Sequence, residues 1–393
     1  MLVHLAARSY RNFDTLDIDV PTSGLAIIGE NGHGKTNLLE AVAYLGLLRS
    51  FRGARDADVI RFGAPAFHVR ATLAAPSAWH TVGVGFERST KRKRATLDGV
   101  EQSRLTQALG AVPSVAFSPA DVILVTGGPA ERRHYLDVML ALSMPAYLHA
   151  LQQYRGALLR RNAALKIAQR DAGGTRGSHA ARVSIWEPAL AEHGGAIVAA
   201  RHAFVRNHAE RYARLCTDIG EREIASLAYA AVGSLGTERP RGARMDDARA
   251  AIVEPDLLNV TAQQEALRHS FEQQRAMELR RGVTLVGPHR DDLTLQLGGR
   301  DLRTFGSAGQ QRSAAIALRL LELATLTTAI GHPPLLLLDD PFAELDLGRA
   351  GRVLALLEDA GAAQVLLAVP RVEDIPAAFT RLDRRQMRQG QLA

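Results

Sequence analysis

The stretch GENGHGKT, Gly29–Thr36, determines how the rest of the chain is interpreted. It matches the phosphate-binding pattern G-x-x-x-x-G-K-[ST] between the apolar run Leu25–Ile28 and a segment with helical apolar spacing. In such loops, backbone N–H groups converge on phosphate oxygens and the positive end of the following helix faces them. The sequence therefore predicts a phosphate site at a strand-to-helix turn.

Each loop position has an expected role, and together they imply ATP with Mg²⁺ as cofactors. Lys35 is expected to reach the β- and γ-phosphates and to act in catalysis, and the Thr36 hydroxyl is expected to coordinate Mg²⁺. The alternative is a glycine-rich turn that binds no ligand. The residues expected to contact the nucleotide here are Gly29, Glu30, Asn31, Gly32, His33, Gly34, Lys35, Thr36 and Asn37.

A second acidic motif stands near the other end of the chain. Four leucines, Leu335–Leu338, run directly into Asp339 and Asp340. Adjacent carboxylates at the end of a buried strand repel each other unless a cation or a shared proton relieves them. We expect Asp339 to hold Mg²⁺ and Asp340 to orient or deprotonate the attacking water. The alternative is a core strand that ends at a solvated turn.

Composition and pattern indicate a folded chain of about two domains. The 393 residues are 47% hydrophobic and 23% charged, with a net charge of +7 that weakly favours polyanionic partners. One cysteine, Cys216, fits a reducing compartment, and no run is expected to reach membrane-span length, so we expect a cytoplasmic protein. Strands alternate with helices at both ends. The expected fold is an α/β P-loop head (1–120 and 283–393), with a mixed sheet and an antiparallel β subdomain, interrupted by an inserted α-helical domain (121–282).

These motifs resemble those of a known family. The chain resembles the ABC-type ATPase heads of the SMC-like DNA-maintenance proteins, and within them the RecF family, in several quoted stretches. These are NGHGKTNLLEAV, SFR (Ser50–Arg52), FSPADVILVTGGPAERRHYLD (Phe117–Asp137), GPHRDDL (Gly287–Leu293), GSAGQQRS and LLLLDDPFAELD. The resemblance implies a weak, DNA-dependent ATPase that dimerises on double-stranded or gapped DNA when it binds ATP. With RecO and RecR it would promote RecA loading, and hydrolysis would reopen the dimer.

The resemblance also implies roles for particular residues. Ser307 and Gly309 correspond to the signature that contacts the γ-phosphate held by the other copy, and a helix N-terminus follows them. Gln310 and Gln311 would bridge ligand and helix, or else be exposed helix residues. Further expected contacts are Arg11 and Asn12 at the nucleotide, unless they form a plain turn, and Glu344 and Asp346 in the loop that crosses the dimer interface.

Three positions depart from the family pattern. The interface loop has Ala343 where serine is more common, and the segment after the last expected strand has Ala368 and Pro370 in place of a threonine-rich turn. That segment also lacks the histidine that many ABC ATPases use to sense the γ-phosphate. These departures favour slow hydrolysis, or a sensor supplied elsewhere.

DNA contacts are expected at the densest basic run, KRKR, at a predicted hairpin tip. Its members are Lys91, Arg92, Lys93 and Arg94. Such a run suits phosphate contacts without sequence specificity, although a solvated tip that protects a strand edge is the alternative. In GPHRDD, a metal site at His289, Asp291 and Asp292 competes with a structural turn, which we favour.

Two other functions are alternatives to a DNA-bound clamp. The energy-coupling ATPase of a membrane transporter is disfavoured by the S-A-G-Q-Q signature and by the large insertion. The head of another SMC-like tethering or nuclease complex would need a long coiled coil, and the insertion has no sustained heptads.

Overall fold

The computed structural model describes residues 1–74, 78–171, 176–234, 257–343, 345–361 and 364–393. The chain forms two compact units. Unit 1 comprises Met1–Val122, Asp218–Gly220 and Arg312–Ala393, and unit 2 comprises Ile123–Thr217 and Glu221–Gln311. The chain thus leaves unit 1 close to the expected boundary after residue 120, but it returns at Arg312, well beyond the expected boundary after residue 282.

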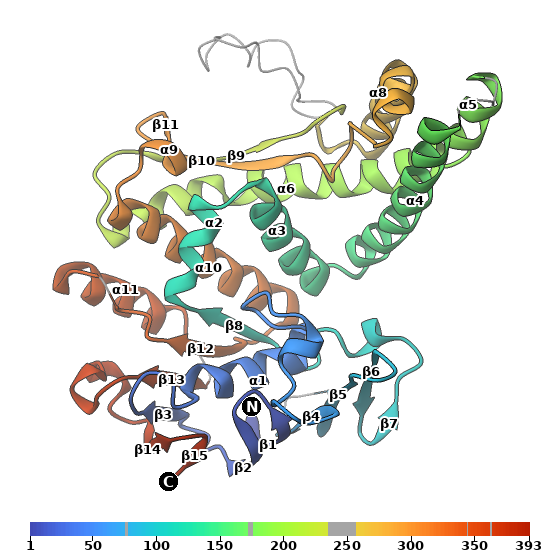
Figure 1. Ribbon diagram of the computed structural model, residues 1–393. Coiled ribbons are helices and arrows are strands. Elements are labelled where there is room, and N and C mark those ends of the chain that lie inside the picture. Colours follow the sequence, from blue (N-terminus) through green and yellow to red (C-terminus); the bar gives the residue numbers. More distant parts are fainter. Residues whose placement is uncertain (75–77, 172–175, 235–256, 344, 362–363) are drawn as a thin grey trace. The chain divides into compact units, whose positions relative to one another are not determined.

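Unit 1 contains an antiparallel sheet of N-terminal strands (blue to cyan in Figure 1) with the order β2-β1-β4-β5-β6-β7. These strands are β1 (Leu2–Tyr10), β2 (Phe13–Asp19), β4 (Ala66–Leu73), β5 (Thr81–Glu87), β6 (Arg92–Leu97) and β7 (Val100–Glu101). Buried and exposed residues alternate along β4, as expected for a sheet with one face on the core. The predicted turn at Asp98 and Gly99 is confirmed, since both have positive φ.

The second sheet of unit 1 has the order β15-β14-β3-β13-β12-β8. Its strands are β3 (Leu25–Ile28), β8 (Ser114–Phe117), β12 (Leu335–Asp339), β13 (Val365–Val369), β14 (Asp383–Arg388) and β15 (Gln391–Leu392). All neighbours pair in parallel except β14 with β15. The sequence predicted β13 as the last strand, and this was wrong. The polar β14 carries no apolar strand signal and is placed by backbone pairing with β3.

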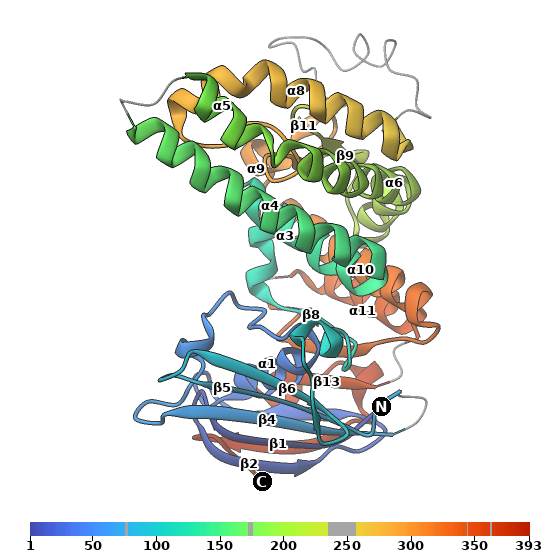
Figure 2. The same cartoon turned by 90° about the vertical axis from the view of Figure 1, so that its right-hand side faces the viewer.

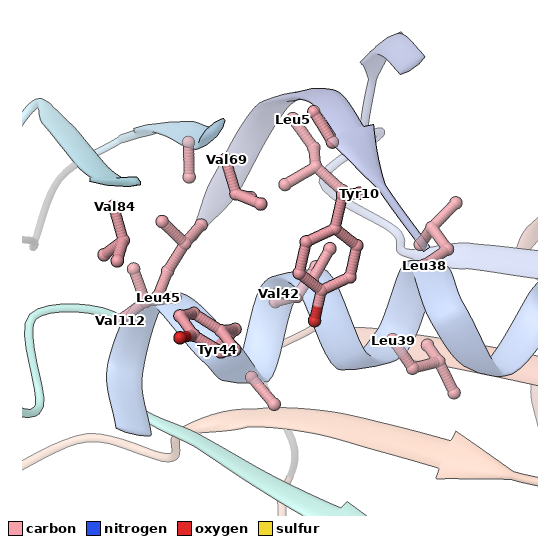
Figure 3. Packing of buried hydrophobic residues seen from close by; sticks show 14 of the residues in the cluster. Leu5, Tyr10, Leu38, Leu39, Val42, Tyr44, Leu45, Val69, Val84 and Val112 are labelled. Carbon is pink, nitrogen blue, oxygen red and sulfur yellow. The ribbon is translucent and has the colours of Figure 1, made fainter. Parts of the chain in front are cut away.

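Helix α1 (Lys35–Leu47) packs against strands of both sheets, as Figure 3 shows from close by. In this view Leu38 and Leu39 point to opposite sides of the helix, and both are fully buried. Tyr10 and Tyr44 meet edge to face, with ring centroids 6.0 Å apart. The helix that carries the phosphate loop is therefore a core helix.

Helices α10 (Ala308–Ile330) and α11 (Leu347–Asp359) complete the described long helices of unit 1, although α10 begins in unit 2. The expectation that no run reaches membrane-span length was wrong. Within the described part of the chain, α10 alone is long and apolar enough to cross a membrane, by length and composition only. However, 61% of its most apolar window is buried inside the structure, as in a core helix of a soluble protein. Its apolar residues thus serve the core.

Short 3₁₀ turns connect several elements of unit 1. They occupy Asp56–Asp58, Leu105–Ala108, Pro119–Val122, Val372–Asp374 and Ala377–Phe379.

Unit 2 combines helices (Figure 2) with a small antiparallel sheet of order β11-β10-β9, whose strands are labelled in Figure 1. Its elements are α2 (Ile123–Thr126), α3 (Pro129–Ser143), α4 (Pro145–Arg170), α5 (Arg176–Ser184), α6 (Glu187–Ile219, which ends in unit 1), β9 (Ala225–Ala230), α8 (Val260–Arg281), β10 (Asp292–Leu297), β11 (Arg300–Asp301) and α9 (Leu302–Phe305). The insertion is mainly helical, as expected, and it also contains this small sheet. Strand β9 alternates buried and partly exposed residues and pairs with β10, which keeps β10 in unit 2.

We predict that Gly46→Ala destabilises unit 1 because α1 lies against a loop there. An added Cβ at Gly46 would stand 2.1 Å from the backbone oxygen of Val112. Chemical denaturation is expected to show a loss of ~3 kcal/mol from this overpacking. Gly351→Ala in α11 is the matched control, since an added Cβ meets nothing within 4 Å; it should be stabilising by ~0.5–1 kcal/mol. Equal effects of the two changes would contradict the close packing of α1.

Candidate nucleotide-binding site

The phosphate loop connects β3 to α1 and depends on glycine at two places. Gly32 and Gly34 have φ angles of 85° and 112°, in the region that favours glycine. A Cβ at Gly34 would stand 2.6 Å from the Asn12 Nδ2 atom. Two constraints therefore require glycine in this loop: the positive φ angles and the close approach of the β1–β2 turn.

Lys35 lies at the start of α1 and is 7% exposed. Its Nζ atom donates to the carbonyl oxygens of Gly29 (2.6 Å) and Glu30 (3.0 Å). Burial lowers the pKa of Lys35, and the charges of Asp339 and Asp340 oppose this effect. The two carboxylates thus help to keep the ammonium group charged inside the loop.

Thr36 and Asp339 are brought together from opposite ends of the chain. The Thr36 hydroxyl donates to Asp339 Oδ1 over 2.8 Å. Burial raises the pKa of Asp339, while the Thr36 hydrogen bond and the charge of Arg52 lower it. A hydroxyl and a carboxylate that converge in this way form the oxygen donor set that Mg²⁺ prefers. The residues present therefore fit the expected ion.

Asp340 leaves the strand in an unusual conformation. Its N–H donates to the Ala368 carbonyl over 2.9 Å, which extends the β12–β13 ladder by one bond. Its φ is 46°, in the left-handed region that aspartate tolerates better than most residues. The backbone therefore turns at Asp340, directly after the strand that ends at Asp339.

The two residues of the β1–β2 turn expected at the nucleotide have different contacts. Asn12 Nδ2 donates to the His33 carbonyl (3.1 Å), and Asn12 Oδ1 accepts from Asn37 (2.8 Å), so Asn12 joins the turn to the loop. Arg11 instead binds both carboxylate oxygens of Glu40 at 2.8 and 2.7 Å. The Arg11 guanidinium thus holds the turn against α1.

Sequence reasoning missed the residues that gather around Glu40. Its side chain is fully buried and also accepts from the Ser50 hydroxyl over 2.5 Å. Arg52 lies 3.8 Å from Glu40 and donates to Asn37 Oδ1 at 3.2 Å. In the sequence, the stretch SFR (Ser50–Arg52) carries a resemblance to the family but no signal of this contact. One signal in the sequence indicates this cluster: Glu40 stands on the apolar side of a predicted core helix. A carboxylate in that position requires a buried cation as its partner.

A cleft of about 700 Å³ opens beside the loop within unit 1. Gly29, Glu30 and His33 line one part of it, and residues 370–373, 386–389 and 391 contribute most of the rest. His33 is tied to the β14–β15 hairpin, since its carbonyl accepts from Gly390 N (2.9 Å) and its Nδ1 lies 3.3 Å from the Met387 carbonyl. The unexpected hairpin therefore supports the phosphate loop.

The expected signature lies in unit 2, at the start of α10. The Ser307 oxygen accepts from Gln310 N (3.3 Å), and Gln310 Oε1 accepts from Ser307 N (2.8 Å), which forms a capping box. Gln311 Nε2 donates to the Leu302 carbonyl over 3.0 Å. Ser307 is exposed and Gly309 is partly exposed. Both glutamines thus organise the helix start, and Ser307 remains open to a ligand.

In the expected interface loop, Asp346 caps α11 by accepting from Arg349 N over 2.9 Å. Its side chain is 66% exposed. The other expected member, Glu344, lies outside the described residues.

Three of the four cationic side chains in the basic run Lys91–Arg94 lie close to acidic side chains. Lys93 binds Asp56 (2.7 Å) and lies over the Tyr44 ring, so it serves the core. Arg92 and Arg94 face Glu101 at 3.2 and 3.6 Å. Lys91, in the turn before β6, is exposed and has no ion-pair partner among the described residues.

The GPHRDD stretch forms a structural turn in unit 2. Asp292 binds Arg132 through both oxygens (2.8 and 2.9 Å), and His289 Nδ1 lies 2.6 Å from the Tyr154 hydroxyl. Among the described residues, no group of three or more His, Cys, Asp or Glu side chains could hold a metal ion. The carboxylates of this motif are occupied by cations and hydroxyl groups.

We predict that Arg11→Gln lowers stability more than ATP affinity. The Glu40 carboxylate would stay buried without its bidentate partner, at a cost of about 3 kcal/mol in urea unfolding. Adding Glu40→Gln is expected to recover part of this loss. Asn12→Ala, by contrast, should weaken ATP binding because the His33 carbonyl loses one of its two donors and keeps only Gly390 N. Loss of ATP binding by folded Arg11→Gln protein would instead make Arg11 a nucleotide contact.

Comparisons with known proteins agree with this geometry. The family model "RecF/RecN/SMC N terminal domain" matches residues 1–390. The "DNA replication and repair protein RecF" of Exiguobacterium sp. is 34% identical over 353 residues, 90% of this chain and 88% of the relative. That of Kineococcus radiotolerans is 36% identical, covering 96% of this chain and 95% of the relative.

Solved structures show the same fold. "Structure of the recombination mediator protein RecF-ATP in RecFOR pathway" superposes with a TM-score of 0.84 at 25% identity, covering 100% of this chain and 96% of that one. The fold is an ABC-type P-loop ATPase head with an insertion. The chain therefore belongs to the RecF family of DNA replication and repair proteins and carries that family's ATP-binding head.

Proposed function

We propose that the protein is an ATP-gated clamp on duplex or gapped DNA. ATP and Mg²⁺ held by Lys35, Thr36 and Asp339 of one copy would be covered by Ser307 and Gly309 of a second. The resulting homodimer would promote RecA loading together with RecO and RecR in the cytoplasm. Slow, DNA-dependent hydrolysis would then reset it.

The observation that carries this proposal is the Thr36–Asp339 hydrogen bond of 2.8 Å. It brings the hydroxyl after the phosphate loop to the end of the acidic strand, where the ion that bridges β- and γ-phosphates is held in P-loop ATPases. The ion would neutralise developing charge on the phosphates. Lys35 would bind phosphate oxygens in place of its present carbonyl partners, and Asp340 would orient the attacking water.

The two-copy site is supported by the start of α10. Its exposed Ser307 hydroxyl stands at the N-terminus of a 23-residue helix, where the dipole favours an anion. The relative solved with ATP is described as a recombination mediator in the RecFOR pathway, and this supports RecO and RecR as partners. The basic composition, with Lys91 exposed at the hairpin, supports contacts with the DNA backbone.

Slow turnover is supported by the segment after β13. Ala368 and Pro370 offer no side chain that could hydrogen-bond a γ-phosphate, and Ala343 offers no hydroxyl in the interface loop. A site without these groups would stabilise the transition state less. We therefore propose that the ATP-bound dimer is long-lived and persists through many encounters with its partner proteins.

We predict that Ser307→Arg abolishes ATP-induced dimerisation but leaves ATP binding by the monomer nearly intact. The arginine would fill the space that a second copy's phosphate must reach. Lys35→Arg is expected to lose both ATP binding and ATP-induced dimerisation. Sedimentation velocity with and without ATP and gapped duplex checks this, with equilibrium binding of a fluorescent ATP analogue measured in parallel.

Asp301→Ala is the matched control for the dimerisation experiment. It removes a comparable helix cap, from α9, because Asp301 accepts from Thr304 N over 3.1 Å. Its dimerisation should equal that of the wild type. If ATP neither dimerises the wild type nor strengthens its duplex binding, the clamp proposal is overturned. If Ser307→Arg loses both activities equally, the shared site is overturned.

Asp340→Asn is expected to trap a long-lived ATP dimer on DNA. The amide cannot accept the proton of the attacking water, so turnover should fall about a hundredfold or more, the lower range of general-base contributions. Phosphate release and dimer lifetime are the measurements. Unchanged turnover of Asp340→Asn would assign the general base to another residue. Asp339→Asn is the comparison, and it is expected to lose Mg²⁺-dependent ATP binding instead.

A further inference from the structure

Two motifs that the ATP site does not use meet in unit 2. The stretch containing Arg132 and Arg133 lies on α3, and the turn Gly287–Asp292 packs against it. Arg133 donates to the Asp291 carbonyl over 2.6 Å. Between these elements, α4 and α6 lies a cleft of about 220 Å³, which we call the Arg133 cleft.

The wall of the Arg133 cleft is largely apolar. Leu151, Leu158 and Ile197 line it, and Leu151 and Ile197 are buried. Tyr154 also contributes; its hydroxyl lies 2.6 Å from the ring of His289. Burial lowers the pKa of His289 to about 4, so this ring is neutral at neutral pH. The wall thus offers apolar surface with few polar groups of its own.

Cations, by contrast, gather among the lining residues. Arg133 and the next residue, His134, lie in the second turn of α3, and Arg155 lies on α4. The N-terminus of α3 at Ala130 also lines the cleft, and its N-cap residue, Gly128, has no side chain that could accept from the first-turn N–H groups. The first-turn N–H groups and the helix dipole therefore add positive potential to that of the arginines.

The carboxylates nearby are already engaged. Asp137 accepts from Arg201 (2.7 Å), Tyr147 (2.6 Å) and Arg155 (2.9 Å), and it lies in the lining. Asp291 accepts from Tyr229 and from Val232 N. Together with the Arg132–Asp292 pair, this cluster contains four guanidinium groups and three carboxylates. The guanidinium groups belong to Arg132, Arg133, Arg155 and Arg201, and the carboxylates to Asp137, Asp291 and Asp292. Arg133 is the one of these four without a carboxylate within 4.0 Å among the described residues.

An anion in the cleft would stabilise the charged form of Arg133, which burial and a neighbouring cation now disfavour. Its pKa is lowered by burial and by repulsion from the charge of Arg201, which the neighbouring carboxylates offset only in part. Guanidinium forks match phosphate oxygens better than any other common side chain does. The volume is below that of clefts for drug-sized ligands, about 300–1,000 Å³, and is close to one phosphate with its sugar.

We propose that the Arg133 cleft binds the phosphate of a single nucleotide, with the sugar against the apolar wall. The nucleotide belongs either to the end of a DNA strand or to a free mononucleotide. Arg133 and Arg155 hold the phosphate, and Leu151 and Ile197 pack against the sugar. This site is separate from the ATP site in unit 1 and does not require dimerisation.

The test uses the full chain without ATP, so that it is independent of the clamp. The probe is a 3′-fluorescein-labelled, 5′-phosphorylated dT12 strand, and fluorescence anisotropy gives its dissociation constant. Arg155→Gln and Arg133→Gln are each expected to weaken binding about tenfold, as for loss of one charge-assisted hydrogen bond. The Arg155 side chain is 61% exposed, so this variant should fold even if Arg133→Gln does not.

Arg206→Gln is the matched control, an exposed arginine of α6 outside the cleft whose change should alter binding less than twofold. Competition identifies the carrier: displacement by thymidine 5′-monophosphate but not by thymidine indicates a free nucleotide, and displacement by unlabelled strand alone indicates a strand end. The proposal is overturned if all three arginine variants bind equally, or if neither the strand nor the mononucleotide binds the wild type.

Discussion

Burial of helix α1 between two sheets is the constraint on which the nucleotide site depends. Its first turn carries Lys35 and Thr36, and its far end is held where Gly46 meets the Val112 carbonyl. Glu40 in its middle is fully buried and is held by Arg11 and other polar groups. A helix with so little free surface cannot move without opening the core. The phosphate loop thus takes its geometry from core packing as well as from its glycines.

Unit 2 is organised by a different interaction, the buried ion pair. Arg161 is fully buried and binds Glu278 (2.6 Å) and Glu187 (2.9 Å), which joins α4, α8 and α6. Arg201 joins α6 to α3 through Asp137. A buried charge without its partner costs several kcal/mol, so these pairs disfavour other arrangements of the same helices. Among the described residues of the cluster around α3, Arg133 is the arginine with no carboxylate within 4.0 Å, and the proposed second anion site rests on it.

How far the sequence predicted the site depends on the kind of contact. Positions whose chemistry is set by neighbours in the chain were predicted: the loop Gly29–Thr36, the strand ending in Asp339 and the helix start at Ser307. Positions whose chemistry depends on distant partners were not. Lys93, an expected DNA contact, binds Asp56 and lies over the Tyr44 ring, and β14 has a polar sequence that is placed by pairing with β3.

By itself, the sequence determined that a phosphate loop follows a buried strand, that an acidic strand accompanies it, and that an insertion separates the two. These features are periodic or adjacent in the chain, so local propensity encodes them. Only the tertiary structure decided that Arg11 serves Glu40, that β10 belongs to unit 2, and that Arg133 lines a cleft. Each of these joins residues far apart in sequence, and such contacts are set by packing and by the cost of leaving a buried charge unpaired.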